Sequence, residues 1–109
     1  MSQAMELIPS MILSILGMDE KSFVYRGTAT DANQCTKMGI WNLPSTAANI
    51  PEDTFRNALV CIPYWGTSVK SFTHLLFSQK GSRGDVFIRT NIDGGDDWSP
   101  WRQIAVTTL

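Results

Sequence analysis

Few residues of this chain are of the types that carry out chemistry, and the sequence does not group them into a catalytic or metal-binding pattern. His74 is the only histidine, and an imidazole acting as a general base needs a positioned partner that the sequence does not supply. Cys35 and Cys61 stand far apart, without the CxxC spacing or histidine cluster of a zinc site. We therefore expect no catalytic residue, no metal and no cofactor, and interpret the protein as non-enzymatic.

These residues have simpler structural explanations. His74 falls in an alternating, strand-like segment that places it on one face together with Phe72 and Leu76. We expect it to be a structural or surface histidine. Cys35 and Cys61 are expected to be separate, buried, small apolar residues, with a disulfide between them as the alternative.

Two short motifs fall where tight turns are expected. Asp93, Asp96 and Asp97 are potential calcium ligands, but they lack the spacing of an EF-hand loop. The tripeptide Arg-Gly-Asp at 83–85 matches a known integrin-binding motif, yet it lies in a glycine-rich turn between two predicted strands. Turn formation is the preferred explanation of both.

Large aromatic residues are the remaining candidates for binding a ligand. They are numerous for a chain of 109 residues: Trp41, Tyr64, Trp65, Trp98 and Trp101. Aromatic rings stack on sugars and anchor protein interfaces, although most of them fill the cores of small domains. Residues 63–66 read as a strand that runs into a loop, where functional residues are often found. Tyr64 and Trp65 are therefore the predicted ligand-binding residues.

The segment 85–104 predicts a β-hairpin with a tryptophan-rich corner. Its first half alternates with the period of a strand, and Gly94 and Gly95 permit the positive φ of a tight reversal. Trp98 and Trp101 open the second half and are expected to pack into the core at this corner rather than to bind a sugar.

Composition places the chain among globular domains. Apolar residues make up 43% and charged residues 17%, against a usual charged share of roughly 25%. The length allows one domain. The formal net charge of −1 offers no basic stripe for phosphates, so we expect no nucleic-acid partner.

The first 20 residues are the most apolar part of the chain and are predicted to form a helical segment ahead of a β-rich domain at 21–109. Met5, Ile8, Ile12 and Ile15 follow the a/d spacing of two heptads. This helix either lies on the core of its own domain or forms a bundle with other copies, and Ile at both a and d favours more than two strands. It is too short to span a bilayer, so we expect no membrane insertion.

The remaining sequence is typical of short β-strands. The predicted strands are 23–26, 38–43, 58–65, 71–79 and the two halves of 85–104, and residues 31–37 hold a turn or one helical turn. Pro63 within its strand indicates an edge position or a bulge. The fold class is mainly β, a small antiparallel β-sandwich or curled sheet with a short N-terminal helix.

The order of several segments resembles the pyocin knob domain of phage tail fibres and phage-tail-like bacteriocins. The segments that carry the likeness are 25–30, 39–42, 58–62, 86–90 and 98–104. Its most specific part is the closing pair, an aromatic-x-Arg-Thr strand followed by Trp-Ser-x-Trp-x-x-Ile. The likeness covers about residues 23–107.

This resemblance implies a structural and recognition module of a phage or prophage tail fibre, trimeric and contributing to host-surface attachment. Such a protein would be made in the bacterial cytoplasm and located in a virion tail or phage-tail-like particle. Its partners would be copies of itself, and a bacterial surface glycan or other tail proteins. Together with the heptad spacing, the resemblance predicts a trimer formed through the N-terminal helix and one sheet face. The alternative is a stand-alone carbohydrate-binding module that uses exposed aromatic residues.

Overall fold

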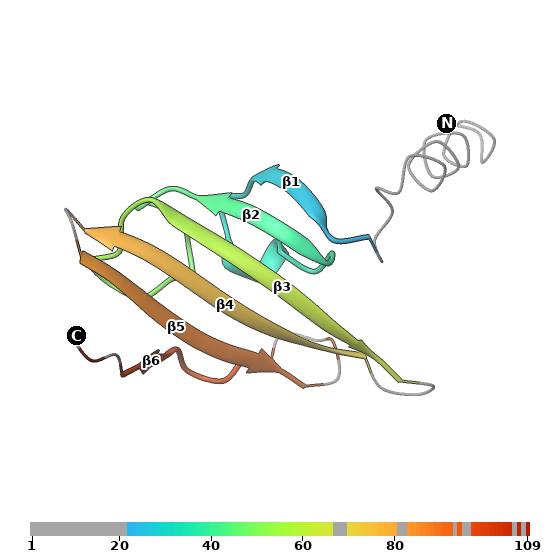
Figure 1. Cartoon of the computed structure of the whole chain (residues 1–109). Coiled ribbons are helices and arrows are strands. Elements are labelled where there is room, and N and C mark those ends of the chain that lie inside the picture. The colour runs from blue at the N-terminus through green and yellow to red at the C-terminus, as the bar shows by residue number, and fades with distance from the viewer. Residues whose placement is uncertain are drawn as a thin grey trace.

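The computed structural model describes residues 22–66, 70–80, 83–92, 94, 97–105, 107 and 109, which form one twisted β-sheet (Figure 1). Its elements in chain order are β1 (Val24–Thr28), the 3-10 turn η1 (Ala32–Gln34), β2 (Gly39–Leu43), β3 (Asn57–Trp65), β4 (Lys70–Lys80), β5 (Arg83–Asn91) and β6 (Arg102–Ile104). The prediction of a mainly β fold is confirmed. The N-terminal helix predicted for residues 1–20 lies outside the described residues.

The six strands follow one another across the sheet in chain order, from β1 to β6. From β2 onward each neighbouring pair is antiparallel, but β1 and β2 are parallel. The prediction of a purely antiparallel fold is therefore wrong for the first pair. The physical reason is the connection at 29–38, which carries the chain through η1 to the end of the sheet where β1 began. The described strands make a single mixed sheet and no second sheet packs on it.

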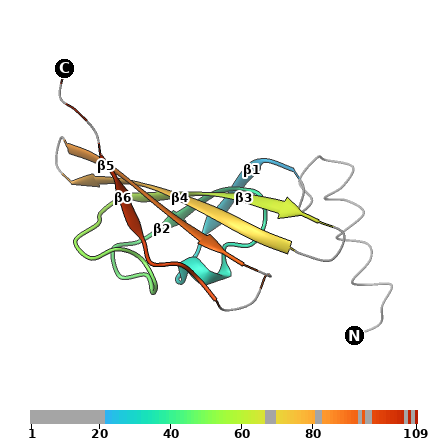
Figure 2. The ribbon, with the colours of Figure 1, turned by 90° about the horizontal axis from the view of Figure 1, so that it is seen from below.

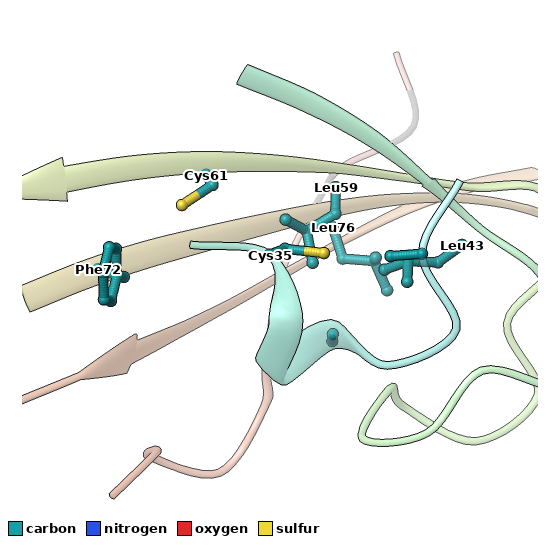
Figure 3. Packing of buried hydrophobic residues seen from close by; sticks show 8 residues of the cluster. Cys35, Leu43, Leu59, Cys61, Phe72 and Leu76 are labelled. Carbon is teal, nitrogen blue, oxygen red and sulfur yellow. The ribbon is translucent and has the colours of Figure 1, made fainter. Parts of the chain in front are cut away.

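Alternation along the strands divides the sheet into two faces. On β4 the buried residues Phe72, His74 and Leu76 share one face, as the sequence predicted. The register places Leu59 of β3 opposite Leu76 and Cys61 opposite His74, so the two central strands contribute to one core. Figure 3 shows this core, whose buried apolar members are Ala29, Ala32, Cys35, Leu43, Leu59, Cys61, Phe72 and Leu76.

Irregular segments cover this buried face. Figure 2 shows η1 and the loop between β2 and β3 on one side of the sheet. The side chain of Asp31 caps η1 by accepting the Asn33 N–H at 2.9 Å, which fits the short polar turn predicted there. Asp31 also forms an isolated bridge with Ala48, joining the two covering segments. η1 thereby inserts Ala32 and Cys35 beneath the sheet.

The predicted hairpin at 85–104 is only partly correct. β5 ends at Asn91, and β6 pairs with it only over 102–104. Trp98 and Trp101 precede β6 instead of lying within it, in a segment held to β5 by the Ser99 N–H, which donates to the Thr90 carbonyl at 2.8 Å. The reversal itself is confirmed: Gly94 has a φ of 69°, the Ile92 N–H donates to the Asp97 carbonyl at 3.4 Å, and Asn91 and Trp98 form an isolated antiparallel bridge.

Candidate interaction surface

The uncovered face of the sheet carries apolar side chains from all six strands, together with the charged side chain of Arg102, which β6 places opposite Ile88. We call it the open face and define it by the apolar side chains that alternation places opposite the core: Tyr25, Ile40, Val60, Ile62, Tyr64, Leu75, Phe77, Val86, Ile88 and Ile104. It faces the viewer in Figure 1, and no described segment crosses it.

The strand register aligns these side chains in rows. Ile40, Val60, Leu75 and Ile88 are successive partners from β2 to β5 and form one unbroken row. Directly opposite side chains in a sheet lie within contact distance, so each row is a continuous apolar strip. None of the described residues that β2 to β5 place on this face carries a charge.

Several of these side chains are open to solvent in the single chain. The exposed fraction is 64% for Tyr64, 55% for Tyr25, 47% for Ile62 and 44% for Phe77. Each buried square ångström of apolar surface contributes about 25 cal/mol, so covering such a face is strongly favourable. Contiguous apolar patches of this kind mark binding sites in soluble proteins. The open face is therefore the candidate interaction surface.

The opposite face holds a buried polar and aromatic cluster centred on His74, which is fully buried. Arg89 Nε donates to His74 Nδ1 at 3.2 Å, and His74 Nε2 lies 2.7 Å from the carbonyl oxygen of Cys35. Because arginine is only a donor, Nδ1 must accept, and the proton of the neutral ring is on Nε2. His74 is thus a neutral residue that bridges β5 and the segment after η1.

Two tryptophan rings complete the cluster. The Arg89 guanidinium carbon lies 4.0 Å from the Trp98 ring centroid and 4.7 Å from that of Trp101. The His74 and Trp98 ring centroids are 4.4 Å apart and stacked. Arg89 Nη2 has no hydrogen-bond acceptor among the described residues, and the two aromatic faces supply the compensating cation–π attraction. Trp98 and Trp101 are thus half-buried and pack against the core, as the sequence predicted for this corner.

Proton chemistry at this cluster is suppressed by burial. Burial, and to a smaller extent the charge of Arg89, lower the pKa of His74 to about 4, against the opposing effect of the hydrogen bond to Cys35. Burial also raises the pKa of the Cys35 and Cys61 thiols to about 12. Both cysteines are buried and free, so they are separate thiols. Both His74 nitrogens are already hydrogen-bonded and neither thiol ionises near neutral pH, which suits a structural role.

The predicted site residues are placed apart. Tyr64 lies on the open face, whereas its neighbour Trp65 points to the other side of β3, where Lys70 Nζ is 4.3 Å from its ring centroid. The two residues therefore do not form one stacking platform. The predicted oligomerisation residues Met5, Ile8, Ile12 and Ile15 lie outside the described residues.

The sequence predicted an interface on one sheet face but did not identify the residues of the open face, although one signal points to them. The runs 58–62, 75–77 and 86–88 are apolar at nearly every position instead of alternating with polar residues. Continuous apolar runs are typical of strands that are covered on both faces. Here the described chain covers only one face, so the pattern predicts a further covering layer.

Within the described ranges, no group of histidine, cysteine, aspartate and glutamate residues has the arrangement of a metal site. The helical content of the same ranges includes nothing long and apolar enough to cross a membrane. Comparison with known proteins finds no matching family model, no similar curated protein and no similar solved structure. The functional argument therefore starts from the open face.

Proposed function

We propose that this protein is a non-enzymatic structural and recognition module of a phage or prophage tail fibre, in which three copies associate through the open face and contribute to host-surface attachment. The observation that carries the proposal is the apolar open face, on which β2 to β5 place no charged residue among those described. A one-layer sheet needs a partner on its second face. In a fibre, that partner is the same sheet in neighbouring copies.

The fibre setting is supported by where the family resemblance falls. Its segments 25–30, 39–42, 58–62 and 86–90 coincide with β1, β2, β3 and β5, and 98–104 contains the tryptophan segment and β6. The pattern that resembles a pyocin knob is therefore the pattern that builds this sheet and its core. The position of this likeness favours a fibre knob over an unrelated β-domain.

Association into a trimer gives the module its proposed mode of action. Three copies would hold three equivalent contact sites in register, so that weak single contacts add up to strong overall attachment. The open face would supply one interface, and the predicted heptads at Met5, Ile8, Ile12 and Ile15 would supply a helical bundle beside it. The protein would act by holding several contact sites in fixed positions, and it would catalyse no reaction.

The first test is the mass of the protein in solution. We expect about 36 kDa by light scattering at low micromolar concentration, three times the 12.1 kDa of one chain. Phe77→Glu and Ile62→Glu each place a charge on the open face, which makes burial of that face unfavourable. Each substitution is expected to shift the mass toward that of a single chain, with an unchanged circular dichroism spectrum.

Gln34→Glu is the matched control, because it adds the same charge to an exposed position on η1, on the covered side of the sheet. It should leave the mass unchanged. A wild-type mass of 12 kDa at this concentration, or a trimer that persists in both open-face variants, would contradict the proposal.

A second candidate function is supported by the exposure of Tyr64. A carbohydrate-binding module uses exposed aromatic faces, and Tyr64 is the most exposed tyrosine on the open face. If this function is correct, a glycan array probed with the monomeric Phe77→Glu variant should retain binding. Adding Tyr64→Ala should abolish it. Trp65→Ala should have a smaller effect, because Lys70 already occupies one side of the Trp65 ring.

A further inference from the structure

Two hollows lie side by side at one end of the sheet, with Arg56 lining both. The first, of about 410 Å³, is bordered by the end of β2 and the start of β3, including Leu43 and Asn57. The second, of about 300 Å³, is lined by Phe55, Gln79 and Lys80 in addition to Arg56. Both volumes are near the lower end of those that hold small ligands, roughly 300 to 1,000 Å³.

The backbone at this point is held in an unfavourable conformation. Arg56 has a φ of 49°, and Asn49 and Asp53 in the same loop have φ values of 61° and 58°. Positive φ is uncommon for residues other than glycine and costs on the order of 1 kcal/mol or more. Arginine at such a position, where glycine would be free of strain, indicates that the side chain has a role.

The residues around Arg56 are fixed to the sheet. The Phe55 N–H donates to Ser78 Oγ at 3.1 Å, and the Gln79 N–H donates to the Phe55 carbonyl at 2.8 Å. On the other side, Asn57 Nδ2 donates to Thr54 Oγ1 at 3.1 Å. These bonds hold the backbone on both sides of Arg56 and so fix the point from which its side chain leaves the loop.

The charged side chains that line the second hollow, Arg56 and Lys80, are both positive. The Arg56 guanidinium makes no hydrogen bond or ion pair with another described residue. Across the second hollow, Lys80 Nζ lies 5.7 Å from the Phe55 ring centroid. No carboxylate is among the residues lining either hollow. The second hollow is therefore lined by two exposed cationic side chains, Arg56 and Lys80, and by the exposed ring of Phe55, in a chain whose formal net charge is −1.

We infer that this end of the sheet, the Arg56 site, binds a small acidic saccharide unit, a sugar ring that carries a carboxylate or a phosphate. Arg56 provides a planar fork that matches either anion, and Lys80 provides a second point charge. The hollows beside Arg56 accommodate the sugar ring next to Phe55. The inference rests on the proposed function for its biological role, as the recognition site of the module, but all contacts come from one chain.

The test uses the full chain and follows amide chemical shifts during titration with glucuronate, glucose 6-phosphate and neutral glucose. Both acidic sugars, or one of them, should shift the signals of residues 55–57 and 79–80, and glucose should not. Comparing the two acidic sugars separates carboxylate from phosphate recognition. Arg56→Gln should weaken binding about tenfold, the loss of one charge-assisted contact, and Lys80→Gln should weaken it by a smaller factor.

Two controls separate a built site from general attraction of anions. Lys37→Gln removes the same charge from an exposed position that lines neither hollow, and should not change the affinity. Arg56→Gly should lose binding while raising the melting temperature, because glycine relieves the strained backbone. Equal weakening by Lys37→Gln, undiminished binding by Arg56→Gln, or acidic sugars that shift only other residues would overturn the inference.

The failure of this site and the failure of the trimer are distinguishable. Titration of the Ile62→Glu variant, whose substitution lies away from both hollows, measures the Arg56 site in single chains, whereas light scattering measures association without any sugar. Binding in that variant supports the site whatever the mass of the wild type. If the protein is a trimer but acidic sugars do not change its spectrum, the proposed Arg56 site is contradicted and the proposed trimer interface is not.

Discussion

Replacing Trp98 with alanine is expected to lower the free energy of unfolding by about 3 kcal/mol, the lower end of the range for truncating a core tryptophan, because Trp98 is half-buried against the core. The Trp98 ring stacks on His74 at 4.4 Å and on Phe72 at 6.4 Å between centroids. It also covers the Arg89 guanidinium at 4.0 Å. Its removal exposes a charge that the fold has taken out of water, in addition to leaving a cavity.

Urea denaturation at one fixed protein concentration measures this loss, because association also contributes to stability by mass action. Trp98→Phe keeps an aromatic face over Arg89 and should lose less than half as much. Trp65→Ala is the matched control at the end of β3, where the ring contacts an exposed lysine instead of the core. A loss for Trp98→Ala no greater than that for Trp65→Ala would refute the central role of the stack.

The positions of the strands could be predicted from the sequence because period-two alternation is a local property. The segments around Val24, Gly39, Asn57 and Lys70 all form strands close to the predicted bounds. The edge position suggested by Pro63 is wrong for β3, which lies between β2 and β4. The strand tolerates this proline because β2 pairs with β3 only as far as Cys61, so no described strand needs a hydrogen bond from position 63 on that side.

The direction of strand pairing and the packing of the segments that cover the sheet could not be predicted from the sequence. The parallel pairing of β1 and β2 is set by the path of the chain through η1, which leaves no periodic signal. Gly94 takes the positive φ that the sequence predicted at the reversal, but the chain after it becomes a strand only at Arg102, because Trp98 and Trp101 pack against the core instead. Tertiary contacts decided the pairing of β1 and the position of β6.

The candidate sites were missed for different reasons. The residues of the open face could not be assigned from the sequence. Strands with apolar residues on both faces, such as β3 and β4, have the same sequence pattern whether the second covering layer comes from the same chain or from another. The Arg56 site depends on positive φ at Arg56 and Asp53, residue types that give no glycine signal in the sequence. The predicted pair Tyr64 and Trp65 failed to share a face because adjacent strand residues point in opposite directions.

Acidification is expected to destabilise the fold through His74. In the unfolded chain its imidazole takes up a proton near the ordinary pKa of 6.5, whereas in the folded protein burial and Arg89 lower that pKa to about 4. Below pH 6.5 the unfolded state therefore binds more protons than the folded state, and the free energy of unfolding falls until about pH 4. At roughly 1.4 kcal/mol per pKa unit, the contribution of His74 over this window is on the order of 3 kcal/mol.

The structural reason is that protonation adds a hydrogen to Nδ1, the atom that accepts from Arg89 Nε at 3.2 Å. The hydrogen bond is lost and two cations are left side by side in a buried cluster. His74→Gln removes the titrating group. This variant should be less stable than the wild type at pH 7, but its stability should fall less between pH 7 and pH 4.

Urea denaturation measures how much the free energy of unfolding falls between pH 7 and pH 4 in each protein. The wild-type fall minus the His74→Gln fall gives the contribution of His74, because the other titrating groups are common to both proteins. It should approach 3 kcal/mol. Nuclear magnetic resonance titration of the imidazole supplies a direct check, since the folded wild type should keep a neutral ring at pH 5. Parallel stability curves for wild type and His74→Gln, or a ring that protonates near pH 6.5 while the protein stays folded, would contradict the neutral bridge between Arg89 and Cys35.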